Sequence, residues 1–419
     1  MKKIEPAFGV ELNEPYFTDK KWVSPFNWWP EVREQMATPP KVLIHDVTLR
    51  DGEQMARVAF TPEEKIFLAL ELDKLGVHSI EPGLPVIQED KDVIKKLSEM
   101  NLNAKIVPLT RVMESDVRAV LDSGADGMLL EFGINPYLMK MVYKTDPNSL
   151  LDQIVEYAQA GKDAGLYVEF MAWDVFRIPD IGFMQRFFEK LALRAPVDRI
   201  TVADTFGMGH PMATYSFIQK LKAWTGKPIG FHIHNDFAMA TAGAVMAVSA
   251  GADMVHSSIN GLGERSGNLA TEEIAFVLQH LLDIDSGINL ELLKPTSDLF
   301  AEVSKLVLAR NKPIVGSGLF EVESGIVVHL VEKLKNTGLA IFPFEPEAVG
   351  HKEYEIILGR GTGVHSIKRL LRERGLEATD DQIERICTRV KQAGLMIKNG
   401  LPKSMVDAIL KEELRVSTP

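Results

Sequence analysis

Short apolar runs alternate with longer amphipathic runs from residue 41 to residue 285. The apolar runs have the length and composition of buried strands, and the amphipathic runs have the length of helices. The strand candidates are Val42–Val47, Ser79–Gly83, Ala104–Leu109, Gly127–Phe132, Tyr167–Trp173, Arg199–Asp204, Ile229–His234 and Met254–Ile259. This alternation predicts a parallel sheet whose strands are joined by helices.

The amphipathic runs carry helix start and stop signals. Thr61 followed by Pro62 and two glutamates is typical of a capped helix start, and Gly76 is typical of a helix end. The helix candidates are Pro62–Leu75, Glu89–Glu99, Ser115–Ser123, Ser149–Ala164, Phe183–Arg194, Tyr215–Trp224 and Ala238–Ala250. Eight strand–helix repeats predict a TIM (β/α)8 barrel. A doubly wound sheet is the alternative, but the count of eight strands favours the barrel.

The rest of the chain lacks this alternation. Residues 1–40 are rich in proline and aromatic residues, and we expect an irregular N-terminal arm there. Residues 41–285 are assigned to the barrel. Residues 286–419 contain helical patterns, glycine-rich connections and one short strand candidate, Glu353–Leu358, and they predict a smaller, mostly helical C-terminal region.

Polar residues gather where the predicted strands end. In a TIM barrel the C-terminal strand ends form the active site. The residues at these positions are Arg50, Asp51, Glu81, Asp174, Asp204, Thr205, His232, His234 and Asn268. Their positions favour an enzyme whose site is assembled from several strands.

Two histidines stand one residue apart at the end of the seventh predicted strand. Alternate strand residues point to the same face, so His232 and His234 project together. Asp51 adds a carboxylate, and Asn268 can add an amide oxygen. This mixed nitrogen and oxygen set, with positions left open, predicts a divalent-metal site. The alternative is that both histidines are packed barrel residues with local hydrogen bonds.

Three other strand-end residues have both a functional and a structural interpretation. Arg50 presents a planar cationic fork that can hold a carboxylate or a developing enolate oxygen, or can pair with Glu81 or Asp46. Glu81 can be a surface carboxylate. Thr205 can bind a carboxylate through its hydroxyl group or cap the following helix.

The composition and net charge of the chain disfavour some classes of binding partner and some cellular locations. The formal net charge of −11 disfavours a nucleic-acid-binding or anionic-membrane-binding surface. The single cysteine, Cys387, suits a reducing compartment. No run approaches the ~20 apolar residues of a membrane span, and the first residues lack the apolar core of a secretory signal. We therefore expect a cytoplasmic protein without nucleic-acid or membrane partners.

Five motifs follow one another along the barrel in a recognisable order. They are Thr48–Gln54, Ile80–Gly83, Ala203–Gly207, His232–Asp236 and Asn260–Asn268. With these motifs the chain resembles the DRE-TIM metallolyase superfamily, in the branch of 2-isopropylmalate, homocitrate, citramalate and Re-citrate synthases. Glu323–Ile326 and Leu358–Lys368 resemble the linker subdomains of the same synthases.

The resemblance implies a metal-dependent acyltransferase of carboxylic acid metabolism and amino-acid biosynthesis. Asp51, His232, His234 and Asn268 would hold a divalent ion such as Mg, Mn, Co or Zn. An acyl-CoA, acetyl-CoA first, would condense with a 2-oxoacid in a Claisen-type reaction. The residues implied to line the oxoacid are Gln54, Glu81, Asp174 and Thr205. The catalytic residues implied are Arg50, Tyr354 and His329. We also expect a homodimer whose C-terminal subdomain is exchanged against the partner barrel.

The chain departs from the synthase pattern at three places. The end of the fourth predicted strand, Glu131–Pro136, is unlike the usual version, which contains a histidine. Trp173 stands where many of these synthases have an acidic residue, and Val327 stands where they have a histidine, with His329 two residues later. One alternative is a carbon–carbon lyase of the 3-hydroxy-3-methylglutaryl-CoA lyase type, although the Glu264–Ser266 loop lacks the cysteine of that family. A non-catalytic homologue that binds metal or metabolite is the other alternative.

Overall fold

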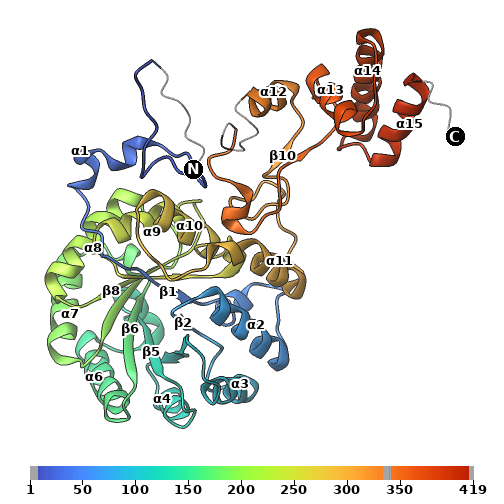
Figure 1. Cartoon of the computed structure of the whole chain (residues 1–419). Coiled ribbons are helices and arrows are strands. Elements are labelled where there is room, and N and C mark those ends of the chain that lie inside the picture. Colours follow the sequence, from blue (N-terminus) through green and yellow to red (C-terminus); the bar gives the residue numbers. More distant parts are fainter. Residues whose placement is uncertain (1–7, 334–338, 340, 415–419) are drawn as a thin grey trace. The chain divides into compact units, whose positions relative to one another are not determined.

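The computed structural model describes residues 8–333, 339 and 341–414, and these residues form two compact units. One unit is the barrel segment Pro25–Leu308, and the other combines Met1–Ser24 with Ala309–Pro419. Each unit has its own core and is described separately. Figure 1 shows the strands of the first unit at its centre with helices around them.

The sheet of the barrel unit runs in the order β3-β2-β1-β9-β8-β7-β6-β5-β4, and all its pairings are parallel. Its strands are β1 (Leu43–Asp46), β2 (Ser79–Ile80), β3 (Lys105–Ile106), β4 (Leu109–Arg111), β5 (Gly127–Gly133), β6 (Tyr167–Trp173), β7 (Arg199–Asp204), β8 (Ile229–Ile233) and β9 (Met254–Ser257). The two outer members, β3 and β4, are consecutive pieces of one strand interrupted at Val107 and Pro108. The sheet therefore closes on itself, and the predicted (β/α)8 barrel is confirmed.

Proline accounts for the shortening of the second and third predicted strands, whereas the first, seventh and eighth end one or two residues inside their predicted bounds. Pro108 splits the third predicted strand, because proline has no N–H to donate to a neighbouring strand. Its carbonyl still accepts from Leu129, and Val107 donates to Ile80 of the other neighbour. In the second predicted strand, Pro82 follows Glu81, and the regular ladder ends at Ile80.

The helices of the barrel unit follow the predicted positions closely. They are α1 (Pro30–Arg33), α2 (Pro62–Leu75), α3 (Gln88–Ser98), α4 (Glu114–Leu121), α5 (Pro136–Leu138), α6 (Pro147–Asp163), α7 (Ile181–Arg194), α8 (Pro211–Thr225), α9 (Ala240–Ser249), α10 (Thr271–Leu281) and α11 (Leu293–Ser304). Thr61 and Glu64 form a reciprocal capping box at the start of α2. Gly76 ends that helix in the left-handed conformation.

The barrel interior is divided between an apolar cluster and a polar cluster. The apolar cluster is built from Val107, Leu109, Leu129, Met171 and Ala203. Fully buried polar side chains project from other strand positions: His45, Glu169, Thr201 and His256. The polar cluster has to be internally hydrogen-bonded, because unpaired buried polar groups are costly.

The second unit is mostly helical, as predicted. It contains α12 (Gly325–Lys333), α13 (Val364–Glu373), α14 (Asp380–Ile397) and α15 (Lys403–Leu414), with the parallel pair β10 (Glu321–Val322) and β11 (Glu355–Ile356). Its core includes Ile367, Ile386, Val390 and Cys387. Cys387 is therefore a packing residue.

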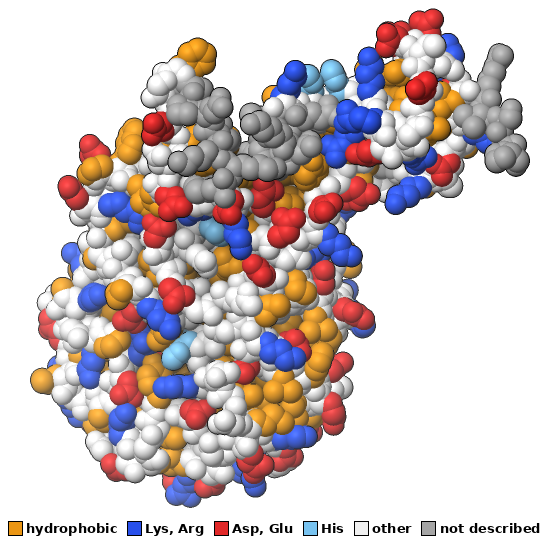
Figure 2. Space-filling view, viewed as in Figure 1, with side chains coloured by type: hydrophobic (Ala, Val, Ile, Leu, Met, Phe, Trp, Pro, Cys, Tyr) orange, Lys and Arg blue, Asp and Glu red, His pale blue; other side chains and the backbone are white. Residues whose placement is uncertain are grey.

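Charged side chains of both signs are mixed over the face of the barrel unit seen in Figure 2, and neither sign dominates it. Among the described helices, none has both the length and the apolar content needed to cross a bilayer.

Two glycines that follow barrel helices allow a test of local packing. Gly76 has φ +98°, and a Cβ atom there would lie 2.3 Å from the carbonyl oxygen of Gly287. Gly165 has φ +80° with no atom within 4 Å of a Cβ. Gly165→Ala should lower the free energy of unfolding by about 1–2 kcal/mol, the cost of left-handed backbone. Gly76→Ala should cost about 1–3 kcal/mol more, because of the clash. Urea unfolding measures both, and equal losses would contradict the close approach.

Candidate metal and substrate site

Three predicted metal ligands converge at the C-terminal end of the barrel strands. Asp51 lies in the turn after β1, His232 lies in β8, and His234 follows that strand directly. The Nε2 atoms of His232 and His234 lie 3.7 Å and 4.0 Å from Asp51 Oδ2. All three side chains are buried, and their candidate ligand atoms lie within 4.8 Å of one another. The predicted convergence is therefore present.

Several buried atoms in this cluster have no hydrogen-bond partner among the described residues. They are Asp51 Oδ1, His232 Nδ1, His234 Nδ1 and Asn268 Oδ1. Asn268 forms a β-bridge with His234, and its amide nitrogen donates to the carbonyl of Leu262 at 3.0 Å. That bond identifies the unpaired atom of the amide as its oxygen. Unpaired carboxylate, amide and imidazole atoms in one buried place fit a divalent cation with oxygen and nitrogen ligands.

Burial prepares both histidines for ligation. It lowers the pKa of His232 well below its usual value, and the neighbouring His234 lowers it further. Burial also lowers the pKa of His234, although Asp51 opposes that shift. Both imidazoles are therefore neutral near pH 7, and a neutral imidazole is the form that binds a metal.

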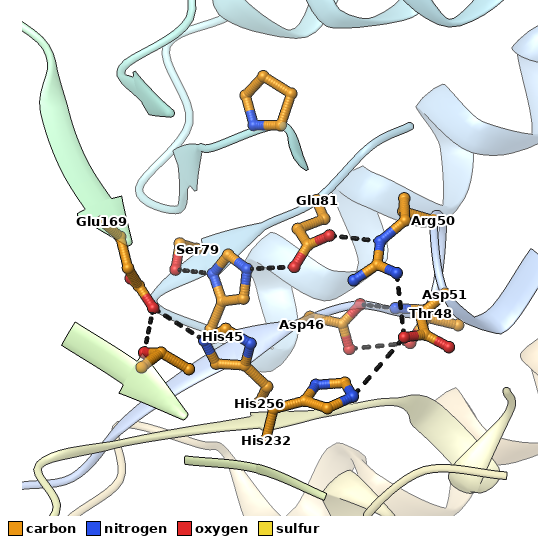
Figure 3. Close-up of polar contacts among 12 residues, drawn as sticks. His45, Asp46, Thr48, Arg50, Asp51, Ser79, Glu81, Glu169, His232 and His256 are labelled. Carbon is orange, nitrogen blue, oxygen red and sulfur yellow. Dashed lines mark hydrogen bonds and ion pairs between the residues drawn. The ribbon is translucent and has the colours of Figure 1, made fainter. Parts of the chain in front are cut away.

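Arg50 connects the second strand to the metal-ligand cluster, as we call the candidate ligands Asp51, His232, His234 and Asn268. Its Nε donates to Glu81 Oε2 at 2.6 Å, and its Nη1 donates to Asp51 Oδ2 at 3.0 Å and to Gln54 Oε1 at 3.3 Å. Figure 3 shows the guanidinium between the two carboxylates. Its Nη2 is buried without a partner among the described residues. Arg50 is thus held in place while one NH2 group stays available.

Glu81 is the structural partner of Arg50. The side chain is fully buried and also contacts His45 Nε2 at 2.9 Å. Burial alone would raise the pKa of Glu81, but the Arg50 charge and the hydrogen bond with His45 outweigh it and lower the pKa to about 2. The ion-pair alternative for Arg50 is therefore present. Direct contact of Glu81 with a substrate stays a prediction.

Below Glu81 lies a polar network that the sequence interpretation missed. His45 Nδ1 contacts Ser79 Oγ at 2.6 Å, and the His45 ring lies 4.4 Å from the His256 ring. His256 Nε2 contacts Glu169 Oε1 at 3.1 Å, and Glu169 also accepts from Thr201. Figure 3 shows Glu81 and His45 following one another beside Arg50, with His256 below His45 and Glu169 on the side away from Arg50. The available signal was the presence of imidazoles and a carboxylate inside strands that had to be buried.

His45, Glu81 and His256 also satisfy the geometry of a possible metal group. Both ring nitrogens of His45 and both oxygens of Glu81 already have protein partners. The Asp51 group instead leaves atoms from each of its members unpaired. The Asp51 group is therefore the better cation site.

Glu131 is a second functional candidate that the sequence interpretation missed. It lies on β5 two residues after Leu129, whose side chain packs inside the barrel, so it faces the interior near the strand end. None of the described residues donates a hydrogen bond to its carboxylate. Burial raises the pKa of Glu131 to about 7, with Glu81 and Asp51 adding to the rise and Arg50 opposing it. The available signal was a carboxylate within a predicted strand that had to be buried.

Other predicted substrate residues have protein partners. Thr205 Oγ1 accepts from the backbone N–H of Asp174 at 2.9 Å. The Asp174 carboxylate accepts from Arg177 at 2.5 Å and 2.8 Å and from Asn135 at 2.9 Å. Its oxygens are therefore occupied by protein donors. The roles of Thr205 and Asp174 toward substrate stay predictions.

The two remaining catalytic candidates belong to the unit that contains the C-terminal helices. The Tyr354 ring lies 6.3 Å from the Phe342 ring, and the Arg369 guanidinium lies 5.9 Å from the Tyr354 ring. The His329 ring lies 4.5 Å from the His365 ring. Their catalytic roles stay predictions.

Comparison with known proteins divides the chain into two matched regions. Residues 41–300 match the HMGL-like family, and residues 314–396 match the family described as homocitrate synthase post-HMGL domain-like. The first region contains every residue of the metal-ligand cluster.

Similar curated proteins cover most of the chain. Homocitrate synthase AksA of Methanopyrus kandleri is 37% identical over 87% of this chain and 91% of its own length. The 2-isopropylmalate synthase of Methanocaldococcus jannaschii is 39% identical over 86% of this chain and 70% of its own. The crystal structure of an HMG-CoA lyase from Bacillus subtilis has a TM-score of 0.60 at 24% identity, covering 66% of this chain and 98% of the lyase. That structural likeness supports the barrel fold alone.

Metal titration tests the ligand cluster. The wild-type chain should bind one equivalent of Mn²⁺ or Co²⁺ at this site, and His234→Ala should abolish that binding because it removes one of only two imidazoles. His210→Asn is the matched control, since His210 caps α8 and asparagine can replace that cap. Calorimetry with elemental analysis gives the stoichiometry. Full binding by the His234 variant would refute the assignment.

Proposed function

Since this chain belongs to the HMGL-like family, we propose that it catalyses a divalent-metal-dependent condensation of an acyl-CoA with a 2-oxoacid. The products are a 2-hydroxy dicarboxylic or tricarboxylic acid and free CoA, and acetyl-CoA is the first donor to test. The observation that carries this proposal is the convergence of Asp51, His232 and His234 beside the guanidinium of Arg50. Each of the three has a buried atom without a hydrogen-bond partner among the described residues.

The comparisons favour a synthase over a lyase. The curated relatives named above are synthases that match most of this chain, and the second matched region is named after homocitrate synthase. The lyase resemblance is structural, at low sequence identity, and covers only part of the chain. The Glu264–Ser266 loop also lacks the lyase cysteine expected there.

Four side chains would hold the cation: Asp51, His232, His234 and Asn268. A divalent ion bound there supplies Lewis-acid polarisation and a template for the keto and carboxylate oxygens of a 2-oxoacid. Gln54 and Thr205 are proposed to contact the oxoacid. Gln54 Oε1 already accepts a hydrogen bond from Arg50 Nη1, which orients the amide nitrogen of Gln54.

Arg50 is proposed to stabilise the enolate of the acyl donor. Glu81 is ionised over the whole neutral range because its pKa is about 2, so it keeps Arg50 Nε engaged. The unpaired Nη2 group is left to donate to the developing oxyanion. A preorganised donor of this kind loses little energy to rearrangement during the reaction.

Glu131 is proposed to act as the base. The Glu131 carboxylate removes the α-proton of the thioester, and the electron pair of the broken C–H bond is delocalised in the resulting enolate. The enolate carbon then forms the new bond to the keto carbon, whose C=O π electrons move to the keto oxygen, and that oxygen takes a proton to become the product hydroxyl. Water later hydrolyses the thioester C–S bond to release CoA. The proposal includes a homodimer with exchanged C-terminal subdomains, in which Tyr354 and His329 serve the partner's reaction.

A thiol-release assay tests the proposed reaction. With metal, acetyl-CoA and a panel of 2-oxoacids, free thiol should appear only when both substrates are present. Arg50→Lys should keep the bound metal and lose about 10²–10³-fold in kcat, the typical effect of removing one oxyanion donor. Cleavage of 3-hydroxy-3-methylglutaryl-CoA would support the lyase alternative. Bound metal without any turnover would support the non-catalytic alternative.

The pH profile tests Glu131. A base must be deprotonated, so kcat/KM should rise with pH through about 7, where the Glu131 pKa lies. Glu131→Gln should lose that rise and at least about 10²-fold in kcat, with unchanged metal stoichiometry. Glu156→Gln, on an exposed face of α6, is the control. A variant that retained both the rate and the profile would exclude Glu131 as the base.

A further inference from the structure

The C-terminal helical unit contains a cavity of about 140 Å³. Residues from β11, from α13 and from the start of α15 line it. Its apolar wall is formed by Ile357, Leu358, Leu370, Leu401 and Val406. The metal-ligand residues of the barrel unit take no part in it.

Two polar groups on α13 border this cavity without a hydrogen-bond partner. Ser366 and Arg369 are three residues apart, so they share one face of the helix. Ser366 is only 1% exposed, and its Oγ has no partner among the described residues. Arg369 Nη1 is likewise buried and unpaired. A hydroxyl donor and a guanidinium donor side by side in a buried place are suited to an anion.

Both signs of charge occur around the cavity. Arg369, Arg374 and Lys403 line it with Glu355 and Glu373, and Arg374 is also paired with Asp407. Glu373 accepts from Arg369 Nε at 2.6 Å, whereas Nη1 has no hydrogen-bond partner among the described residues. Glu373 therefore holds the Arg369 side chain in place at Nε, while the Nη1 group can still donate a hydrogen bond to a ligand.

We propose that this cavity binds a short aliphatic monocarboxylate. Its carboxylate accepts hydrogen bonds from Arg369 Nη1 and Ser366 Oγ, and its hydrocarbon tail packs against Leu358 and Val406. A cavity of about 150 Å³ accommodates benzene, so about six to eight non-hydrogen atoms suit this one. Phosphate would satisfy the donors but would leave the apolar wall without a contact.

Binding here has a direct route to Tyr354. The same Arg369 guanidinium lies over the Tyr354 ring. A ligand that recruits Arg369 Nη1 therefore changes the surroundings of that tyrosine. An effect of the ligand on catalysis through Tyr354 rests on the proposed function. The binding site itself does not, because no residue of the barrel site lines it.

Calorimetry on the full chain tests the site independently of turnover. 3-Methylbutanoate is the probe, 3-methylbutan-1-ol supplies the same tail without the charge, and inorganic phosphate supplies charge without the tail. The carboxylate should bind at least tenfold more tightly than either control. No detectable binding, or equal binding of the alcohol or of phosphate, would overturn the proposal.

Variants locate the binding. Arg369→Gln should weaken the carboxylate at least tenfold, and Ser366→Ala should weaken it severalfold. Val406→Met, which fills the cavity while keeping both donors, should also reduce binding, and thermal unfolding checks that each variant is folded. Arg385→Gln is the control, because Arg385 pairs with Glu413 and does not line the cavity. Binding unchanged in both the Arg369 and the Val406 variants would place it elsewhere.

Discussion

The buried ion pair between Arg50 and Glu81 is the interaction on which the barrel site depends. The Arg50 side chain is 6% exposed and Glu81 is fully buried, so neither charge is well solvated. A buried pair gains little net stability, because desolvation offsets the attraction, but losing either partner leaves an uncompensated charge. The pair therefore works mainly as a geometric constraint. It holds the guanidinium against Asp51 and connects the metal-ligand cluster to β2.

The constraint continues downward through the barrel. Glu81 is bound by His45, the His45 ring packs at a tilt against the His256 ring, and His256 contacts Glu169. Each contact restricts the orientation of the next side chain. The polar half of the interior thus supports the strand-end residues in the way that packed apolar side chains support the other half. A rigid arrangement of this kind keeps catalytic groups oriented before substrate arrives.

The sequence predicted the fold well, because its signals are local. Buried strands, capped helices and helix-ending glycines are recognisable from short windows, and all eight predicted strands are present. It also predicted the cluster of Asp51, His232 and His234, since strand ends of a barrel meet at one face. It missed Glu131 and the His45 network because parallel strands are buried on both faces and alternation does not reveal which residues point inward. The partners of Asp174 depend on Asn135 from another strand end, which no local pattern identifies.

The interruption of the third strand affects where the barrel opens locally. Its two pieces are joined to their neighbours by only two and three paired residues, whereas β5 and β6 share seven. Local opening is easiest where fewest ladder bonds must break. Amide hydrogens on either side of Pro108 should thus exchange with solvent before those of the β5–β6 ladder. The last register pair of β4 joins Arg111 to Glu131, so local opening of this strand would occur next to the carboxylate proposed as the base.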